Sequence, residues 1–112
     1  TLLATAMFTT KNESTYKNIE GNWITEPNAI YGVIHRMAVG EKFRGTGIAK
    51  FIFNSCEKIL KQNAIHSMRI DTHEDNLGMQ ALLKKLGYVF CGVIYLENND
   101  KRLAFEKLIT KG

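Results

Sequence analysis

The sequence predicts an α/β domain with a mixed, mainly antiparallel sheet flanked by helices. Residues 31–39 and 67–72 are extended and largely apolar, and residues 48–60 between them repeat apolar side chains at helical spacing. A strand, a helix and a second strand in this order favour a right-handed crossover, and therefore one parallel strand pair. Residues 88–96 and 102–108, separated by a polar turn, indicate an antiparallel hairpin.

The N-terminal part is predicted from weaker local signals. Residues 2–8 read as a short strand, and residues 9–28 as a polar, turn-rich loop with a turn of helix near residues 16–19. Within this loop, Trp23 is either an aromatic that contacts a substrate or a side chain that caps the core.

A second helix is expected at residues 77–86, where leucines and a methionine recur at helical spacing. Asn76 before it is a good N-cap residue, and Gly87 after it suits the conformation that ends many helices. The predicted order is therefore strand, loop, strand, helix, strand, helix, strand, strand.

Length and composition describe one globular domain. With 112 residues the chain can form one hydrophobic core, and 45% hydrophobic residues is typical of globular proteins. The 15 basic and 11 acidic residues are scattered, with no basic run longer than Lys84-Lys85, so no nucleic-acid partner is expected. No stretch has the length of a membrane span and no leader pattern occurs, so we expect no membrane partner and a cytoplasmic location.

Neither a disulfide nor a metal site is expected. Cys56 falls on the first helix and Cys91 in an apolar strand, and both are interpreted as buried thiols. His73 and Glu74 are not followed by a second histidine at helical spacing, so no metal cofactor is predicted.

The turn before the first helix carries the clearest functional signal. Gly45 and Gly47 flank Thr46, free the backbone and let a ligand approach the amides closely. The first turn of a helix has unpaired N–H groups and the positive end of the helix dipole, which suits phosphate, and Arg44 adds a positive charge. A Walker loop is excluded because no Gly-Lys-Ser/Thr occurs, and a dinucleotide fingerprint because Lys50 stands where glycine or alanine is required.

Two motifs together resemble those of a known family. The first is Arg44-x-x-Gly47-x-Ala49 after the strand residues Met37-Ala38-Val39, and the second is Asn76-x-x-Met79-x-x-Leu82-Leu83-x-x-x-Gly87-Tyr88. In this combination they resemble the coenzyme A motifs of the GNAT superfamily, the acyl-CoA-dependent N-acyltransferases. The resemblance covers residues 31–108 and implies that residues 1–112 are a single, N-terminally incomplete domain without the family's usual first strand and two helices.

The resemblance also implies how acetyl-CoA, the co-substrate, would bind. The two parallel strands would splay apart, and the pantetheine arm would occupy the gap like an extra strand, pairing with backbone groups that would otherwise lack partners. The pyrophosphate would lie on the amides of residues 44–49, and the thioester carbonyl would face a backbone donor near Met37. The implied contacts are Met37, Ala38, Val39, Arg44, Gly45, Thr46, Gly47, Ile48, Ala49 and Asn76.

The chemistry that the resemblance implies is transfer of an acetyl group to a primary amine by direct attack. The amine must be neutral, and His35 is the candidate base, although it could equally be a structural histidine on a half-buried strand. Leu83 stands where the family usually has a tyrosine that protonates the leaving thiolate, so Tyr95, and also Tyr88, are considered as substitutes. The alternative function is a non-catalytic acyl-CoA-binding module, a sensor or a scaffold.

The expected partner is an amine acceptor, either a small molecule or a peptide. We also expect the two helices to leave one apolar face of the sheet uncovered, with Ile34, Ala38, Val89 and Val93 on it. Such a face would favour a homodimer or belong to a longer chain, unless residues 9–28 fold back over it.

Overall fold

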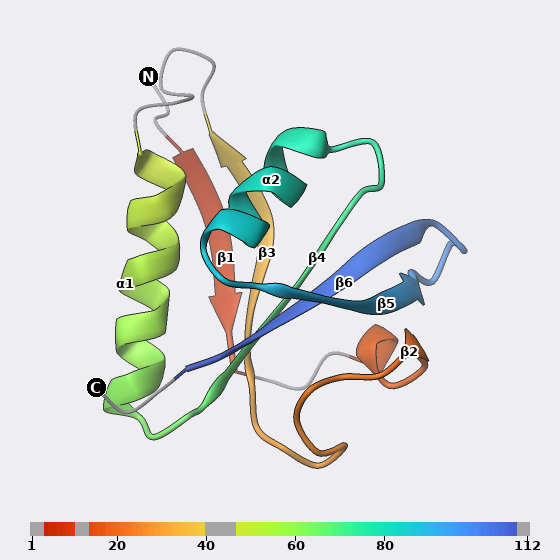
Figure 1. Ribbon diagram of the computed structural model, residues 1–112, viewed down its shortest axis with the longest axis horizontal. Helices are drawn as coiled ribbons and strands as arrows, with labels where there is room; N and C mark the ends of the chain where they lie inside the picture. Colours follow the sequence, from red (N-terminus) through yellow and green to blue (C-terminus); the bar gives the residue numbers. More distant parts are fainter. Residues whose placement is uncertain (1–3, 11–13, 40–46, 110–112) are drawn as a thin grey trace.

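A six-stranded mixed sheet forms the centre of the computed structural model, which describes residues 4–10, 14–39 and 47–109 (Figure 1). The strands lie in the order β1-β3-β4-β6-β5-β2. The strands are β1 (Ala4–Thr9), β2 (Glu20–Gly21), β3 (Gly32–Val39), β4 (Ser67–Thr72), β5 (Val89–Tyr95) and β6 (Lys101–Leu108). The helices are α1 (Ile48–Gln62) and α2 (Leu77–Lys85), with a short 3-10 helix, η1, at Ser14–Tyr16.

The sheet has the predicted mixture of strand directions. β3 and β4 are parallel, whereas β1 with β3, β4 with β6, β5 with β6, and β2 with β5 are antiparallel. The parallel ladder contains only two pairs, Gly32↔Met68 and Val33↔Arg69, although β3 continues to Val39. The two strands start side by side and then diverge (Figure 1). The predicted α/β class and the splayed parallel pair are therefore confirmed.

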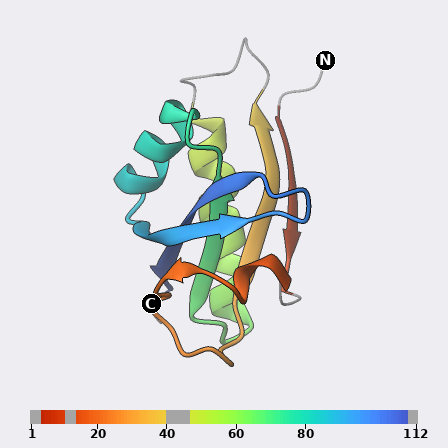
Figure 2. The ribbon, with the colours of Figure 1, turned by 90° about the vertical axis from the view of Figure 1, so that its right-hand side faces the viewer.

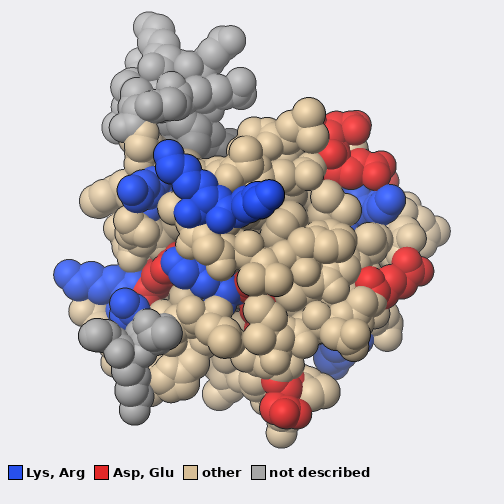
Figure 3. Space-filling view, viewed as in Figure 1, with Lys and Arg blue, Asp and Glu red and all other residues tan. Residues whose placement is uncertain are grey.

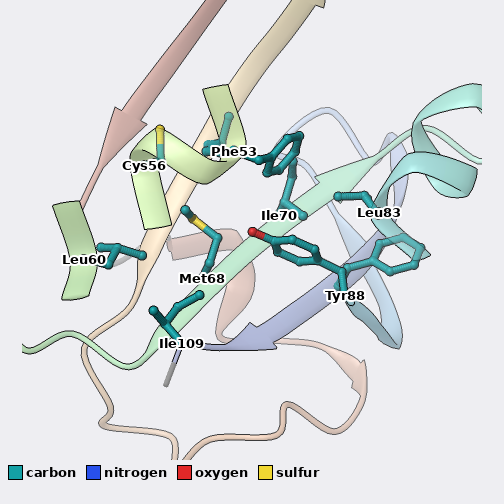
Figure 4. Close-up of a cluster of buried hydrophobic side chains, with 10 residues drawn as sticks. Phe53, Cys56, Leu60, Met68, Ile70, Leu83, Tyr88 and Ile109 are labelled. Atoms are coloured by element: carbon teal, nitrogen blue, oxygen red, sulfur yellow. The ribbon is translucent and has the colours of Figure 1, made fainter. Parts of the chain in front are cut away.

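One face of the sheet and both helices share the larger hydrophobic core (Figure 4). α1 contributes Phe53, Cys56 and Leu60, which recur every three or four residues and so lie on one side of the helix. α2 contributes Leu83, which is fully buried, and the following Tyr88 packs edge-on against Phe53 with ring centroids 5.6 Å apart. The other core residues are Ile34, Met68, Ile70, Phe105 and Ile109.

The opposite face is covered by the segment from η1 to Pro27, which we call the cover segment. In Figure 2 this orange segment lies in front of the sheet and α1 lies behind it. Tyr16 of the cover segment is buried, and Ile19 and Trp23 pack against the same cluster. Its other buried members are Tyr31, Val33, Ile94 and Ala104.

The expectation of an uncovered apolar face is therefore wrong for these residues. Ile34, which we had placed on that face, is buried in the core shared with the helices. Val93 is half-buried, and only Val89 is well exposed, at 52%. The alternation of a strand predicts which residues share a face, but it does not show which face a helix will cover. The side chain of Ala38 lies outside the described residues.

A buried ion pair anchors the cover segment. The Arg69 guanidinium lies between two rings, 4.3 Å from the Trp23 centroid and 4.1 Å from that of Tyr31. Nε of Arg69 is 3.2 Å from Oε2 of Glu106, and both side chains are almost fully buried. Glu106 also accepts hydrogen bonds from the hydroxyls of Ser67 and Thr25 and, at 2.6 Å, from the Ile24 amide.

These interactions determine the protonation of Glu106. Burial alone would raise its pKa, but hydrogen bonds from Ser67 and Thr25 and the charge of Arg69 keep the pKa below its ordinary value. The carboxylate therefore stays ionised and holds the cover segment from both β4 and β6.

Two further features answer expectations from the sequence. Cys56 and Cys91 are free thiols, the first buried and the second half-buried. Within the described part of the chain, no helix combines the length and apolarity needed to cross a bilayer.

Candidate active site

A cavity of about 870 Å³ lies where β3 and β4 diverge. It brings together two residues that sequence patterns singled out separately, His35 on β3 and Asn76 at the start of α2. The end of β4 and the turn between β5 and β6 form its other walls. The lining residues are Thr15, Ile34, His35, Ile70, Asp71, Thr72, His73, Asn76, Met79, Leu96, Glu97, Asn98 and Arg102.

His35 and Asp71 face each other across the mouth of this splay. Val33 and Arg69 form the last pair of the parallel ladder, and His35 and Asp71 are the residues two positions further along each strand. Because side chains alternate along a strand, both lie on the same face as Val33 and Arg69. His35 is half-buried, as is Asp71.

Asp71 is oriented from the cover segment. The hydroxyl of Tyr16, which is 1% exposed, donates a hydrogen bond of 2.6 Å to Oδ1 of Asp71. Thr15, the preceding residue, lines the cavity itself. The cover segment therefore supports one carboxylate and one wall of the candidate site.

Asn76 occupies the predicted N-cap of α2. Its Oδ1 accepts a hydrogen bond of 3.0 Å from the Met79 amide, so the helix start is satisfied locally. The side-chain amide keeps its N–H donors, which can still contact a ligand in the cavity that Asn76 lines. Its expected contact with the pantetheine arm stays a prediction.

The backbone beside the cavity fits the expected arm of the co-substrate. Beyond Val33, the edge of β3 that faces β4 has no ladder partner among the described residues, and this edge includes Met37, Ala38 and Val39. An extended chain with amide groups can pair with such an edge. The side chains of these three residues lie outside the described part.

The expected phosphate-binding turn is described only at its end. Gly47 is the N-cap of α1, with a φ of 88° and a ψ of 4°, and Ile48 and Ala49 form the first helical turn. Since no side chain caps this helix end, its first amides face outward without a local acceptor, as a phosphate site requires. Arg44, Gly45 and Thr46 lie outside the described residues.

The structure does not bring the tyrosine candidates for the general acid into the cavity. Tyr95 is 43% exposed, and its hydroxyl is 3.4 Å from Oε2 of Glu20 at the edge of the sheet. Tyr88 is buried and donates a hydrogen bond of 3.0 Å to Glu57 of α1; burial and the charge of Glu57 raise its pKa far above the ordinary value. Leu83 is fully buried in the core. None of these three side chains lines the cavity.

Sequence reasoning missed Asp71 and the residues that support it. Asp71 was read as part of an acidic turn, whereas it lies in β4, paired with Ala104 of β6. A single carboxylate in an otherwise apolar strand was an available signal, because such a group requires a partner or a use. Among the described residues, no group of three or more His, Cys, Asp or Glu side chains could hold a metal ion.

A sheet splayed at one parallel pair, with a phosphate-type helix start and an asparagine-capped helix beside the gap, defines the fold of acyl-CoA-dependent acyltransferases. Comparison with known proteins gives the family. The sequence model of the acetyltransferase (GNAT) family matches residues 1–88, and the chain belongs to this family, which uses acetyl-CoA.

Solved structures agree with this assignment. A GNAT-family acetyltransferase from Streptococcus agalactiae is 34% identical with a TM-score of 0.82, and the match covers 97% of this chain and 60% of that one. The present chain thus spans about 60% of the length of that relative. No curated protein sequence matches the chain significantly.

More distant structures share the fold alone. A GNAT-family acetyltransferase from Listeria monocytogenes is 18% identical with a TM-score of 0.70, over 96% of this chain and 58% of that one. A chain of the NatC complex bound to a Gag peptide and CoA is 18% identical with a TM-score of 0.65, over 83% of this chain and 58% of that one.

Proposed function

We propose that the protein transfers an acetyl group from acetyl-CoA to a primary amine by direct attack, without a covalent enzyme intermediate. One observation carries this proposal: the parallel ladder ends at Val33, and the cavity that opens there is lined by both His35 and Asn76. Membership of the GNAT family supports acetyl transfer in general. The amine acceptor and the direct mechanism are our inference from the site.

The residues around the splay suggest how substrates would be held. The edge of β3 beyond Val33 would pair with the amides of the pantetheine arm, and the start of α1 at Gly47 would bind the pyrophosphate. This geometry would place the thioester at the mouth of the cavity, next to His35. A backbone N–H near Met37 would then stabilise the oxygen that becomes negative during attack.

His35 would act as the base. An amine attacks only when its nitrogen has a lone pair, so a proton must leave the ammonium form first. A neutral imidazole beside the amine can accept this proton directly or through one water molecule. The thiolate would take its proton from solvent, since the described tyrosines do not line the cavity.

The proposal is tested by product formation. The protein is incubated with acetyl-CoA and a panel of primary amines, and both thiol release and acetylated product are measured by mass. Transfer to an amine supports the proposal. Binding of CoA without any acetylated product would instead favour the non-catalytic acyl-CoA-binding module, for which the buried Leu83 at the usual tyrosine position is the main argument.

The role of His35 gives the first mutational prediction. The variant His35→Gln should lower kcat/KM by about 100-fold or more, the usual contribution of a general base, and should remove the acidic limb of the kcat/KM profile. KM for acetyl-CoA should change little, because the pantetheine contacts come from backbone groups.

His66→Gln is the matched control, because His66 is an exposed histidine that does not line the cavity. It should leave rate and pH profile unchanged. If His35→Gln keeps both the rate and the acidic limb, the histidine is structural and the base must be sought elsewhere.

A further inference from the structure

The side of the cavity away from α1 is acidic. Asp71 and Glu97 both line the cavity, on β4 and on the turn after β5. The turn before α2 adds Glu74 and Asp75, and Figure 3 shows acidic side chains gathered on the side where these two turns lie. Basic side chains in the same view lie mainly over the helices.

The nearby basic groups are engaged with acidic ones or with the backbone. Arg102, which lines the cavity, is 3.9 Å from Asp100 and donates a hydrogen bond of 3.0 Å to the Lys101 carbonyl. The ammonium of Lys101 is 3.2 Å from Glu74. His73 accepts a hydrogen bond of 3.0 Å from the Asp75 amide. The described walls of the cavity therefore favour a cation over an anion.

Asp71 is the carboxylate best placed to use this charge. It stands opposite His35 at the mouth of the splay, two positions beyond the last ladder pair. The Tyr16 hydroxyl fixes it through one oxygen, but a carboxylate has two oxygens and accepts several hydrogen bonds. An ammonium group, with three donors, could bind Asp71 while lying next to His35.

We propose that Asp71 binds the acceptor as a protonated amine next to His35, and that the acceptor is a primary amine without a carboxylate near its nitrogen. The proposal rests on the proposed function and specifies its substrate class. An amino acid would bring its own carboxylate close to Asp71, and like charges at this distance repel each other. The corresponding amine lacks this penalty.

The reaction then balances in protons and electron pairs. The bound ammonium gives one proton to His35, and its lone pair forms the C–N bond to the acetyl carbon while the C–S bond breaks. The nitrogen loses its second proton, and the thiolate takes one to leave as the CoA thiol. Overall, amine cation and acetyl-CoA become amide, CoA and one released proton.

The first test is equilibrium binding without acetyl-CoA. Three matched pairs differ only by one carboxylate: phenethylamine and phenylalanine, histamine and histidine, cadaverine and lysine. In calorimetric titrations, the wild type should bind the amine of at least one pair about tenfold or more tightly than its amino acid, the scale of one charged hydrogen bond. Asp71→Asn should abolish the preference.

Two variants serve as controls. Glu26→Gln removes one exposed carboxylate outside this cavity and should keep the preference, which separates a local contact from net charge. Asp71→Asn can still accept from Tyr16, so it should fold; if it does not, Tyr16→Phe removes only the orienting hydrogen bond and should weaken the preference. A preference that survives both Asp71→Asn and Tyr16→Phe overturns the proposal, as does equal binding within all three pairs.

Turnover separates this proposal from the proposed function. If amines are acetylated, Asp71→Asn should raise KM for the amine about tenfold or more and leave KM for acetyl-CoA unchanged. An unchanged KM for the amine would overturn the role of Asp71 while acetyl transfer stands. If no amine is acetylated, the proposed function fails, and the binding titrations alone decide whether Asp71 selects ammonium groups.

Discussion

At Gly47 the chain passes from a turn into α1 through a left-handed conformation, with a φ of 88°. A side chain added here would meet no atom within 4 Å, so any cost of substitution comes from the backbone and not from a clash. Residues with a Cβ pay about 1 to 2 kcal/mol in this region, and β-branched residues are especially unfavourable. Relief of that strain would reorient the first amides of the helix.

We therefore predict that Gly47→Val weakens CoA binding by about tenfold, since roughly 1.4 kcal/mol of misdirected hydrogen bonding is a factor of ten. Gly87→Val is the matched control, because Gly87 ends α2 with a similar φ of 94° and does not line the cavity. Both variants should lose stability in thermal unfolding, but only Gly47→Val should lose CoA affinity in titration calorimetry. Equal affinities would mean that the start of α1 does not bind the pyrophosphate.

Among the elements, the cover segment depends on a few long-range contacts. Trp23 stacks on Arg69, its indole N–H donates a hydrogen bond of 2.9 Å to the Tyr16 carbonyl, and its ring lies 5.2 Å from that of Tyr16. Together these contacts attach the middle of the segment to β4 and to η1.

We predict that Trp23→Ala destabilises the protein by about 2 to 4 kcal/mol, because it removes a large aromatic side chain and a partly desolvated cation–π contact. The cover segment should become the first site of proteolytic cleavage. Trp23→Phe, which keeps a ring for Arg69 but loses the N–H donor, should lie between Ala and the wild type. Denaturant unfolding and limited proteolysis measure both effects, and an unaltered cleavage pattern in Trp23→Ala would contradict them.

The same element shows what the sequence could not predict. β4 at Ser67–Thr72 and the start of α1 at Ile48 agree with the prediction because local periodicity and a glycine turn define them. Tyr16, Ile19 and Trp23 follow no strand or helix period, and Trp23 finds its partner Arg69 far along the chain. Only long-range contacts turn residues 9–28 from a loop into a cover.

The candidate site divides in a similar way. His35 and Asn76 were recognisable because one lies on a regular strand and the other precedes a regular helix. The position of Asp71 opposite His35 depends on the register of a parallel pair, which a long crossover leaves unspecified in the local sequence. The expected catalytic role of Tyr95 remains without structural support, since a strand pattern does not show which sheet edge a side chain faces.

For the whole molecule, the buried Glu106 links stability to pH. Its pKa is lower in the folded protein than its ordinary value, so ionised Glu106 stabilises the fold at neutral pH. This contribution is complete above the pKa of the unfolded chain and is lost as pH falls through the folded pKa. The free energy of unfolding should therefore decrease as the pH is lowered from about 5 towards 3.

Ser67→Ala tests this link, because it removes one hydrogen bond to the Glu106 carboxylate. The variant should lose about 1.5 to 3 kcal/mol at pH 7, the range for hydrogen bonds to charged groups, and less at pH 3. Glu74→Gln, which breaks only a surface pair with Lys101, should change stability by under about 1 kcal/mol at either pH. Urea denaturation measures all three proteins; a Ser67→Ala deficit that is equal at both pH values would place the protonation elsewhere.

The two-pair ladder between β3 and β4 has a consequence for how the molecule opens. On one side of it lie β1 and β3, and on the other β4, β6, β5 and β2. The strands of each side are paired over most of their length, so each is suited to act as its own cooperative unit in native-state hydrogen exchange. We expect two groups of amides with different opening free energies in the protein alone. An acyl-CoA arm bridging the gap would merge them into a single group.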